Sequence, residues 1–485
     1  MRAVIRISVC IIIIYLAFCV FKSLKAFGKF LALNGALSVE IAFPMCYNNK
    51  IKLIQRRFIM AKAKFRITNP YESVSELITN PENHYKTNLH THSTYSDANN
   101  TMTEMVEGFY DNDFDILAFA EHGIVGKEWD KEPTRIPLFH FQLLWHGKRH
   151  HPSTEMYHAV LDGSYKTAKG LRTKKRGLQC VPDAIETNMF TLMKNHVNGY
   201  FTNVYEGKYG KENDFEIPIR LIEESGGISH INHPSDWLGA YKDPDCARVP
   251  ENIAFFADLF RRYKSCVGME VLNMYDRPNR SDRILWDGLL RTLIPEGRNV
   301  WGFGNSDAHR VCEIDTAFMD FILPGYSLKN LRTAMESGHF FAVARYAKNE
   351  LGEDFKGEGA VPVVTEIKVD EDAQTITVAG KNCNAIEWIA DGEIIESVTA
   401  EKDGEMVSTV NLAEKSDKIS CYVRCQLKGR GGICMTQPFV CDAGNLAELV
   451  VEVKKPAPLT RKEQRKKDFG NTRLGVIVNK IKDKR

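Results

Sequence analysis

Metal-binding side chains recur at separated places along this sequence. The stretch NLHTHSTYSD, residues 88–97, holds His90 and His92 two apart and Asp97 five residues later. Further along come Glu121 and His122 in FAEHG, His233 in INHP, and Asp307 and His309 in GNSDAHR. Imidazole and carboxylate side chains together suit zinc, manganese or iron. The pattern therefore predicts a metal centre, whereas a histidine standing alone elsewhere is expected to be an ordinary core or surface residue.

Each of these motifs follows an apolar stretch that is typical of a strand. Residues two apart on a strand point the same way, so His90 with His92, and Asp307 with His309, can share one centre. Strands and helices alternate between residues 86 and 345, which favours a parallel sheet or barrel. The C-terminal ends of parallel barrel strands meet at one face, so the motifs are expected to converge there.

Further candidates lie between and beside these motifs. Glu186 follows LQCVPDAI, and His196 lies ten residues further on. Glu270, in GMEVLN, is either a carboxylate that orients a ligand imidazole or an ordinary strand-end residue. Arg310, directly after His309, is a candidate contact for a substrate phosphate.

The order of these motifs carries a family resemblance. HTHSTYSD, EH, E-x9-H, NHP and SDAH, spread over residues 86–345, resemble the polymerase and histidinol phosphatase (PHP) family of metallo-phosphoesterases. The resemblance implies an α/β fold, a distorted TIM-like (β/α)7 barrel, with two or three divalent ions of zinc, manganese or iron. It implies nine metal ligands: His90, His92, Asp97, His122, Glu186, His196, His233, Asp307 and His309. Glu186 is expected to bridge two ions, and Glu186, His196, Asp307 and His309 are expected to act in catalysis.

Two positions depart from the family pattern. Glu121 stands where the family usually has aspartate, and Ala98 stands where a glycine often follows the aspartate of the first motif. Because Glu121 is expected to lie behind the ligands and orient an imidazole, a longer carboxylate is tolerated there. The layout with a following β-sandwich resembles a branch of the family whose substrate is unassigned.

The barrel region is expected to span residues 60–350, after an N-terminal extension at 1–59. The apolar run at 7–21 is a membrane anchor, a cleaved signal, or part of a misassigned start with Met60 as the initiator. Residues 125–180 are predicted to be an insertion that overhangs the pocket. Its basic stretch, KTAKGLRTKKRG, is either a solvated loop or a lid that attracts a phosphorylated substrate.

The sequence changes character after about residue 360. Short runs rich in β-branched and aromatic residues at 360–445 predict a small, all-β, Ig-like sandwich that is not catalytic. Residues 446–485 read as a basic, loosely docked tail.

Composition sets limits on partners and compartment. The chain has 485 residues, 44% hydrophobic and 26% charged, and its net charge of +2 does not by itself require a nucleic-acid partner. Its 12 cysteines include no Cys-x-x-Cys pair, so we expect mostly reduced, buried thiols in a reducing, cytoplasmic compartment. A retained anchor at 7–21 would instead place the protein at a membrane.

These observations together predict a metal-dependent hydrolase. A hydroxide bridging two ions would attack the phosphorus of a small phosphomonoester or phosphodiester, while the ions take up charge on the phosphoryl oxygens. Two alternatives stay open. One is hydrolysis of a non-phosphate ester or amide at the same centre, and the other is a non-catalytic accessory or nucleic-acid-associated module.

Overall fold

The structure is a computed structural model that describes residues 64–133, 149–187, 195–204, 215–276 and 279–450. All of these residues belong to one compact unit, which spans 59–485. The apolar run at 7–21 and the basic tail from 451 onward lie outside the described residues. Among the helices that are described, none has the length and apolar character needed to cross a membrane.

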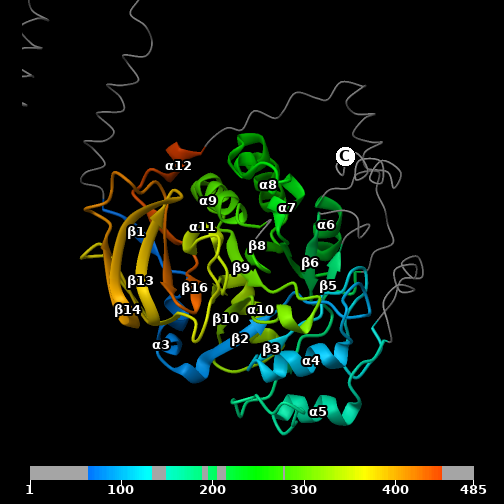
Figure 1. Cartoon of the computed structure of the whole chain (residues 1–485). Coiled ribbons are helices and arrows are strands. Elements are labelled where there is room, and N and C mark those ends of the chain that lie inside the picture. Colours follow the sequence, from blue (N-terminus) through cyan, green and yellow to red (C-terminus); the bar gives the residue numbers. More distant parts are fainter. Residues whose placement is uncertain (1–63, 134–148, 188–194, 205–214, 277–278, 451–485) are drawn as a thin grey trace, which may run out of the picture. The chain divides into compact units, whose positions relative to one another are not determined.

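A smaller sheet carries three of the five predicted motifs. Its five described strands run in the order β5 (Ile185–Thr187), β6 (Val197–Tyr200), β7 (Ile228–Ile231), β8 (Cys266–Asn273) and β9 (Trp301–Asn305). The strands β7, β8 and β9 are parallel, whereas β5, β6 and β7 pair antiparallel. Figure 1 shows the helices α6 (Glu216–Glu224), α8 (Pro250–Arg262) and α9 (Asp282–Leu293) beside this sheet. Their apolar faces, with Ile222, Phe260 and Leu289, bury against strand residues in one core.

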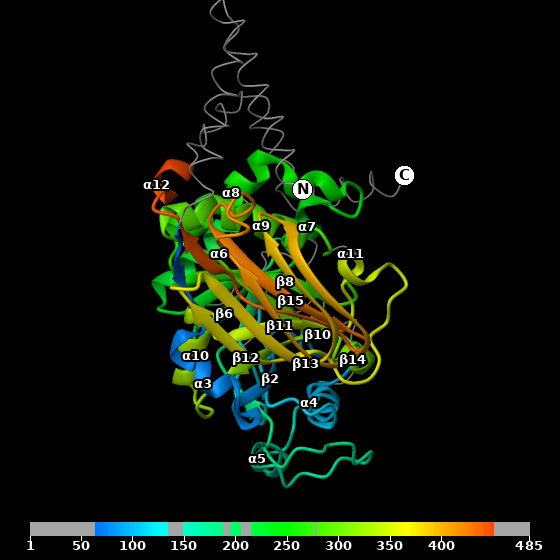
Figure 2. The same ribbon diagram turned by 90° about the vertical axis from the view of Figure 1, so that its left-hand side faces the viewer.

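A larger sheet joins the first motifs to the C-terminal strands. Twelve described strands belong to it, and its path runs through β1 (Arg66–Thr68), β17 (Phe439–Asp442), β15 (Tyr422–Gly429), β16 (Gly432–Met435), β11 (Phe340–Ala344), β10 (Ala317–Ile322), β2 (His84–Asn88), β3 (Ile116–Leu117) and β4 (Gln179–Cys180). The remaining strands are β12 (Val363–Asp370), β13 (Thr375–Ala390) and β14 (Glu393–Asn411), which lie side by side in Figure 2. The strands β2, β3 and β4 are parallel.

Two isolated parallel bridges connect the sheets at the predicted site. Thr91, after β2, pairs with Ala308 after β9, and His122, after β3, pairs with Glu186 in β5. The predicted α/β fold with alternating strands and helices is therefore confirmed. A closed (β/α)7 barrel is not shown, because the described strands form two separate sheets and several neighbouring strands are antiparallel.

The C-terminal strands continue the larger sheet. β16 pairs antiparallel with β11, so that Ala342 lies opposite Met435. Residues 360–445 are rich in strands, as predicted, but a separate Ig-like sandwich is not shown. The strand β1, which precedes the site in the sequence, also pairs within this region, with β17.

The basic stretch of the insertion lies at the opposite ends of the strands from the metal-binding motifs. The Arg172 guanidinium donates hydrogen bonds to the carbonyls of Tyr110 and Phe114, at 2.8 and 3.1 Å. Lys174 pairs with Asp115, which directly precedes β3, whereas His122 follows that strand. Acidic residues before β3 thus hold the basic stretch at the end of the sheet opposite to the metal centre, which does not support a lid there. Residues 134–148 lie outside the described residues, so the overhang predicted for the insertion stays a prediction.

A buried ion pair attaches the C-terminal strands to helix α9. The Arg424 guanidinium, on β15, donates two hydrogen bonds to the Asp287 carboxylate, at 2.9 and 2.8 Å. The Tyr422 hydroxyl donates a third, at 2.7 Å. The Arg424 and Asp287 side chains are only 5% and 9% exposed, so each charge depends on the other for compensation.

We expect Asp287→Ala to lower the free energy of unfolding by about 3–5 kcal/mol, because it leaves the Arg424 charge buried without a partner. Glu336→Gln is the matched control, since Glu336 forms an exposed pair with Arg332 on one helix and should cost less than about 1 kcal/mol. Urea denaturation of both variants measures the difference. Equal losses in the two variants would contradict the assigned role of the buried pair.

Candidate metal centre

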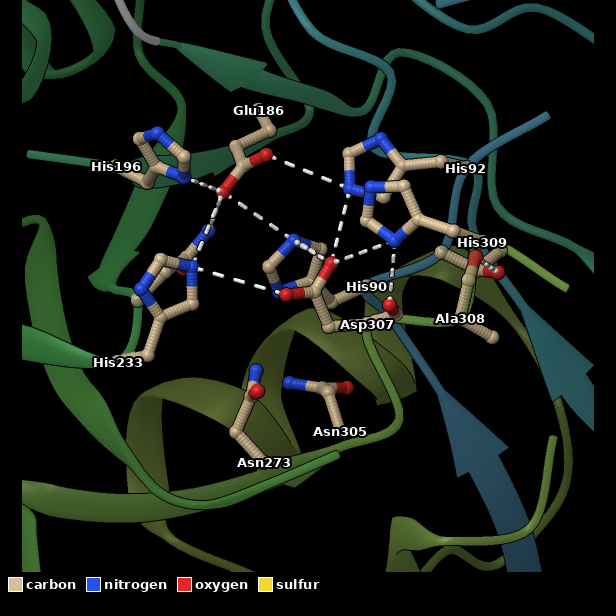
Figure 3. A network of polar contacts seen from close by, with 12 residues as sticks. His90, His92, Glu186, His196, His233, Asn273, Asn305, Asp307, Ala308 and His309 are labelled. Atoms are coloured by element: carbon tan, nitrogen blue, oxygen red, sulfur yellow. Dashed lines mark hydrogen bonds and ion pairs between the residues drawn. The ribbon is translucent and has the colours of Figure 1, made fainter. Parts of the chain in front are cut away.

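The structure brings all nine predicted ligands together at one place. Ligand-type atoms lie within 4.8 Å of one another in four overlapping groups. The groups are His92, Asp97, His122 and His309; His90, His233 and Asp307; His90, His92 and Glu186; and His122, Glu186 and His196. In Figure 3, His196 and His233 approach Glu186 from one side, and His92 and His309 lie on the other.

The ends of the parallel strands create this convergence. His90 and His92 follow β2, His122 follows β3, His233 follows β7, and Asp307 follows β9. The isolated bridges from Thr91 to Ala308 and from His122 to Glu186 bring those ends side by side. The chain turns sharply where the ligands sit, and both His233 and Asp307 have positive φ, at 27° and 47°. Such conformations cost on the order of 1–3 kcal/mol each and persist where the surroundings enforce them.

Glu186 is the carboxylate that touches the most imidazoles. Its Oε1 lies 2.9 Å from His196 Nδ1 and 3.3 Å from His90 Nε2. Its Oε2 lies 2.7 Å from His122 Nδ1 and 3.4 Å from His92 Nε2. His233 Nε2 lies 3.7 Å from Oε1, so one buried carboxylate faces five rings with its two oxygens, the arrangement that a bridging ligand needs.

Two aspartates complete the set. Asp307 Oδ1 lies 3.2 Å from His90 Nε2 and 3.1 Å from His92 Nε2. Asp97 lies further out, 3.4 Å from His122 Nε2 and 3.3 Å from His309 Nε2. The side chains of Asp97 and His309 are 26% and 27% exposed, more than those of the other seven, so they mark the open side of the centre.

The unsatisfied polar atoms fit a cation. His90 Nε2, His92 Nε2, Glu186 Oε2 and Asp307 Oδ1 are buried and make no hydrogen bond within the described residues. Buried lone pairs that face one another are costly, and each such group loses on the order of 1–3 kcal/mol without a partner. A divalent cation among them would remove that cost. The donor set of nitrogens and carboxylate oxygens is the one expected for zinc, manganese or iron.

Glu270 fixes the His90 imidazole. Its Oε1 accepts a hydrogen bond from His90 Nδ1 at 2.8 Å, which leaves the Nε2 lone pair directed at the centre. Asn305 and Asn273 donate to the same carboxylate at 3.0 and 2.8 Å, and the His233 backbone N–H donates at 3.2 Å. The sequence analysis missed both asparagines. Their only signal was their position at the ends of β8 and β9.

Glu121 acts on His92 through a serine. The hydroxyls of Ser93 and Ser96 donate short hydrogen bonds to the Glu121 carboxylate. Because the Ser96 proton points to Glu121, its oxygen accepts from His92 Nδ1, at 3.2 Å. Burial raises the pKa of Glu121 to about 7. Burial, together with the neighbouring His309 and His122, lowers the pKa of His92 to about 4, so this ring is neutral at pH 7 and offers Nε2 as a ligand.

Arg310 points to a neighbouring acid. Its side chain is 52% exposed, and its Nε lies 2.8 Å from Glu313 Oε1. Glu313 also accepts a hydrogen bond from the His309 backbone N–H at 2.9 Å. The structure thus places Arg310 in an ion pair that steadies the His309 segment, and its suggested contact with a substrate phosphate stays a prediction.

No family model and no curated protein matches the sequence. Among solved structures, the chain is similar to a two-domain protein from Bacteroides vulgatus ATCC 8482 that contains a predicted PHP-like metal-dependent phosphoesterase. That likeness has 15% identity and a TM-score of 0.38, and covers 74% of this chain and 96% of that chain. The chain is also similar to PsfC from Pseudomonas syringae PB-5123, with 16% identity, a TM-score of 0.29, and coverage of 50% and 84%. A third similar structure is the lesion-specific endonuclease PfuEndoQ from Pyrococcus furiosus. It has 15% identity and a TM-score of 0.29, and the match covers 52% of this chain and 56% of that chain. The chain resembles the PHP family in the order of its motifs, and we interpret its centre from its own geometry.

We expect Glu270→Gln to weaken divalent-metal binding by about 10–100-fold. A neutral amide oxygen is a weaker acceptor than the Glu270 carboxylate for the His90 Nδ1–H, so the ring is held less firmly. Glu387→Gln is the matched control. Glu387 is also a buried strand carboxylate, but its partners are Gln426 and Lys428, in the C-terminal strands. Competition with a chromophoric chelator measures both affinities. If Glu270→Gln binds metal as tightly as Glu387→Gln does, Glu270 has no part in the centre.

Proposed function

We propose that this protein is a metal-dependent phosphoesterase that hydrolyses a small phosphomonoester or phosphodiester. The observation that carries the proposal is the group of four buried, hydrogen-bond-free atoms on His90, His92, Glu186 and Asp307, which face one another within a set of nine ligand-type side chains. Two or three divalent ions fit this set. Zinc, manganese and iron are the candidates on the chemistry of the donors.

The nine side chains would hold the ions, with Glu186 shared between two of them. When bound, such ions supply a nucleophile from water at neutral pH and neutralise charge on phosphoryl oxygens. The protein's own contribution is position. Glu270 orients His90, and Glu121 orients His92 through Ser96, so both rings present Nε2 to the same point.

The open side indicates where substrate would enter. Asp97 and His309 are about a quarter exposed, whereas His90 and Glu186 are fully buried. A phosphoryl group would therefore approach past Asp97 and His309, with the ester's organic part left toward solvent. On the opposite side, Glu270 and His90 are fully buried, and electrostatic interactions are stronger there than in water.

The finer fold assignments belong to the same proposal. We interpret the two isolated bridges as the closing points of a distorted barrel of the PHP type, in which β2 meets β9 and β3 meets β5. Residues 60–350 would form that barrel with its insertion, and 360–445 would be a β-domain attached through β11 and β16.

We expect His90→Ala and Asp307→Asn each to lower the rate of phosphoester hydrolysis by more than about 100-fold. Each change removes a proposed metal ligand, and the bound ions would stabilise negative charge on the reacting phosphoryl group. The substrates are p-nitrophenyl phosphate and bis(p-nitrophenyl) phosphate, with the chain loaded with zinc, manganese or iron in turn. His339→Ala is the control, since His339 touches Ser73 away from the centre.

Circular dichroism and the melting temperature verify that the variants fold. Undiminished hydrolysis in either site variant would refute the centre. Cleavage of p-nitrophenyl acetate or an anilide without cleavage of either phosphate would replace the phosphoesterase proposal with the ester or amide hydrolase. No cleavage of any of these by the metal-loaded wild type would favour the accessory module.

A further inference from the structure

A cavity with several basic lining residues lies away from the metal centre. Its volume is about 650 Å³, within the range of roughly 300–1,000 Å³ typical of small-molecule sites. Its lining comes from β2 and the segment before it, from the basic stretch of the insertion, from β10 and β11, and from β12 and β13 with the segment before β12. Its basic lining residues are His84, Lys86, Lys174, Lys175, Arg176 and Lys381.

The cavity is separate from the metal centre. None of the nine proposed metal ligands is among its lining residues. Lys86 lies in the middle of β2, whereas His90 follows the end of that strand. At about 3.3 Å per residue, four residues of strand separate the two backbone positions by roughly 13 Å. An occupant of the cavity and an occupant of the metal centre would thus be held by different side chains.

The cations of the cavity are only partly balanced. Lys86 pairs with Asp315, and Lys174 pairs with Asp115. Two further lining lysines, Lys175 and Lys381, make no ion pair with any residue that the structure describes. Of the two lining acids, Asp320 is held by His84 at 2.6 Å, and Glu82 lies 3.5 Å from Arg176. The cavity therefore keeps an excess of positive charge.

Arg176 is fixed in place before any anion arrives. Its guanidinium lies 3.8 Å from the centre of the Tyr85 ring. It also donates a hydrogen bond to the His84 carbonyl at 3.1 Å. The Arg176 side chain held in this way has already lost most of its rotamer freedom, so less conformational entropy is lost when it binds an anion.

We propose that this cavity is a second binding site that takes a small phosphate-bearing anion. A fixed guanidinium and lysine ammonium groups around one cavity are donors suited to the oxygens of a dianionic phosphate. Such an anion would connect the insertion, β2 and β13. Its binding would stabilise the folded chain by mass action. The proposal does not depend on hydrolysis at the metal centre, because neither Lys175 nor Lys381 lies there.

Titration calorimetry of the metal-loaded full chain with inorganic phosphate tests the proposal. We expect Lys175→Gln/Lys381→Gln to weaken phosphate binding at this site at least tenfold, and to abolish the rise in melting temperature that this binding produces. The matched control is Lys329→Gln/Lys402→Gln, which removes two exposed lysines elsewhere and should bind as the wild type does. His90→Ala separates the two sites, since it should leave binding at the cavity unchanged.

Three results would overturn the proposal. The first is phosphate binding that survives in Lys175→Gln/Lys381→Gln but disappears in His90→Ala, which would place it at the metal centre. The second is an equal loss in the control pair, which would make it a general effect of charge. The third is that the wild type shows no binding of phosphate at the cavity at phosphate concentrations up to roughly 50 mM, which would mean a dissociation constant too weak for a specific site. Succinate that binds as tightly as phosphate would replace the phosphate class with a dicarboxylate.

Discussion

The mutual approach of buried lone pairs is the constraint on which the rest of the structure depends. Glu186 and Asp307 lie among imidazole nitrogens at 2.7–3.4 Å, and their side chains are only 1% and 10% exposed. Carboxylate oxygens and ring nitrogens at such distances need a positive charge between them. A bound cation supplies it, and without one a protonated ring does so. Burial lowers the pKa of His90, but the nearby Asp307, Glu270 and Glu186 carboxylates outweigh burial and raise that pKa well above its usual value. Strand ends, sharp turns and a layer of supporting hydrogen bonds keep these side chains together. The fold thus maintains a donor set that a divalent cation would stabilise.

The supporting contacts extend well beyond the centre. Glu270 holds His90 by its ring and His233 by its backbone. Asp282, at the start of α9, accepts from the Ser235 N–H at 2.7 Å, two residues after His233. Later in the same helix, Asp287 is bound by Arg424 of the C-terminal strands. The C-terminal strands therefore reach a proposed ligand through one helix, which gives them a structural part in the site although they supply none of the nine ligands.

The strand-end ligands were predictable because their signal is local, and the family resemblance implied the full set of nine. His-x-His and Asp-x-His pairs directly after apolar runs give both the donor types and their direction, and the structure brings all nine side chains together. The supporting asparagines carried no such signal, because an amide at a strand end suits many roles. Only the folded chain shows that Asn273 and Asn305 meet on Glu270.

Long-range arrangement was the part that the sequence did not determine. The spacing of strands and helices predicts an α/β fold, but it does not distinguish parallel from antiparallel neighbours such as β5 and β6. It also says nothing of where an insertion returns to the sheet. Asp113 and Asp115 hold the basic stretch at the far ends of β2 and β3, and these two acids lie about 60 residues earlier in the chain. The pairing of β16 with β11 is equally non-local, and it turns a predicted separate sandwich into a continuation of the sheet.

Metal content per chain tests the central claim most directly. Elemental mass spectrometry of the full chain, purified without chelator or nickel affinity, would count zinc, manganese and iron. We predict two or three equivalents in the wild type and a clear loss in His90→Ala. If the wild type holds no metal, even after reconstitution with all three, the nine side chains do not form a metal centre, and the account of function given above is wrong.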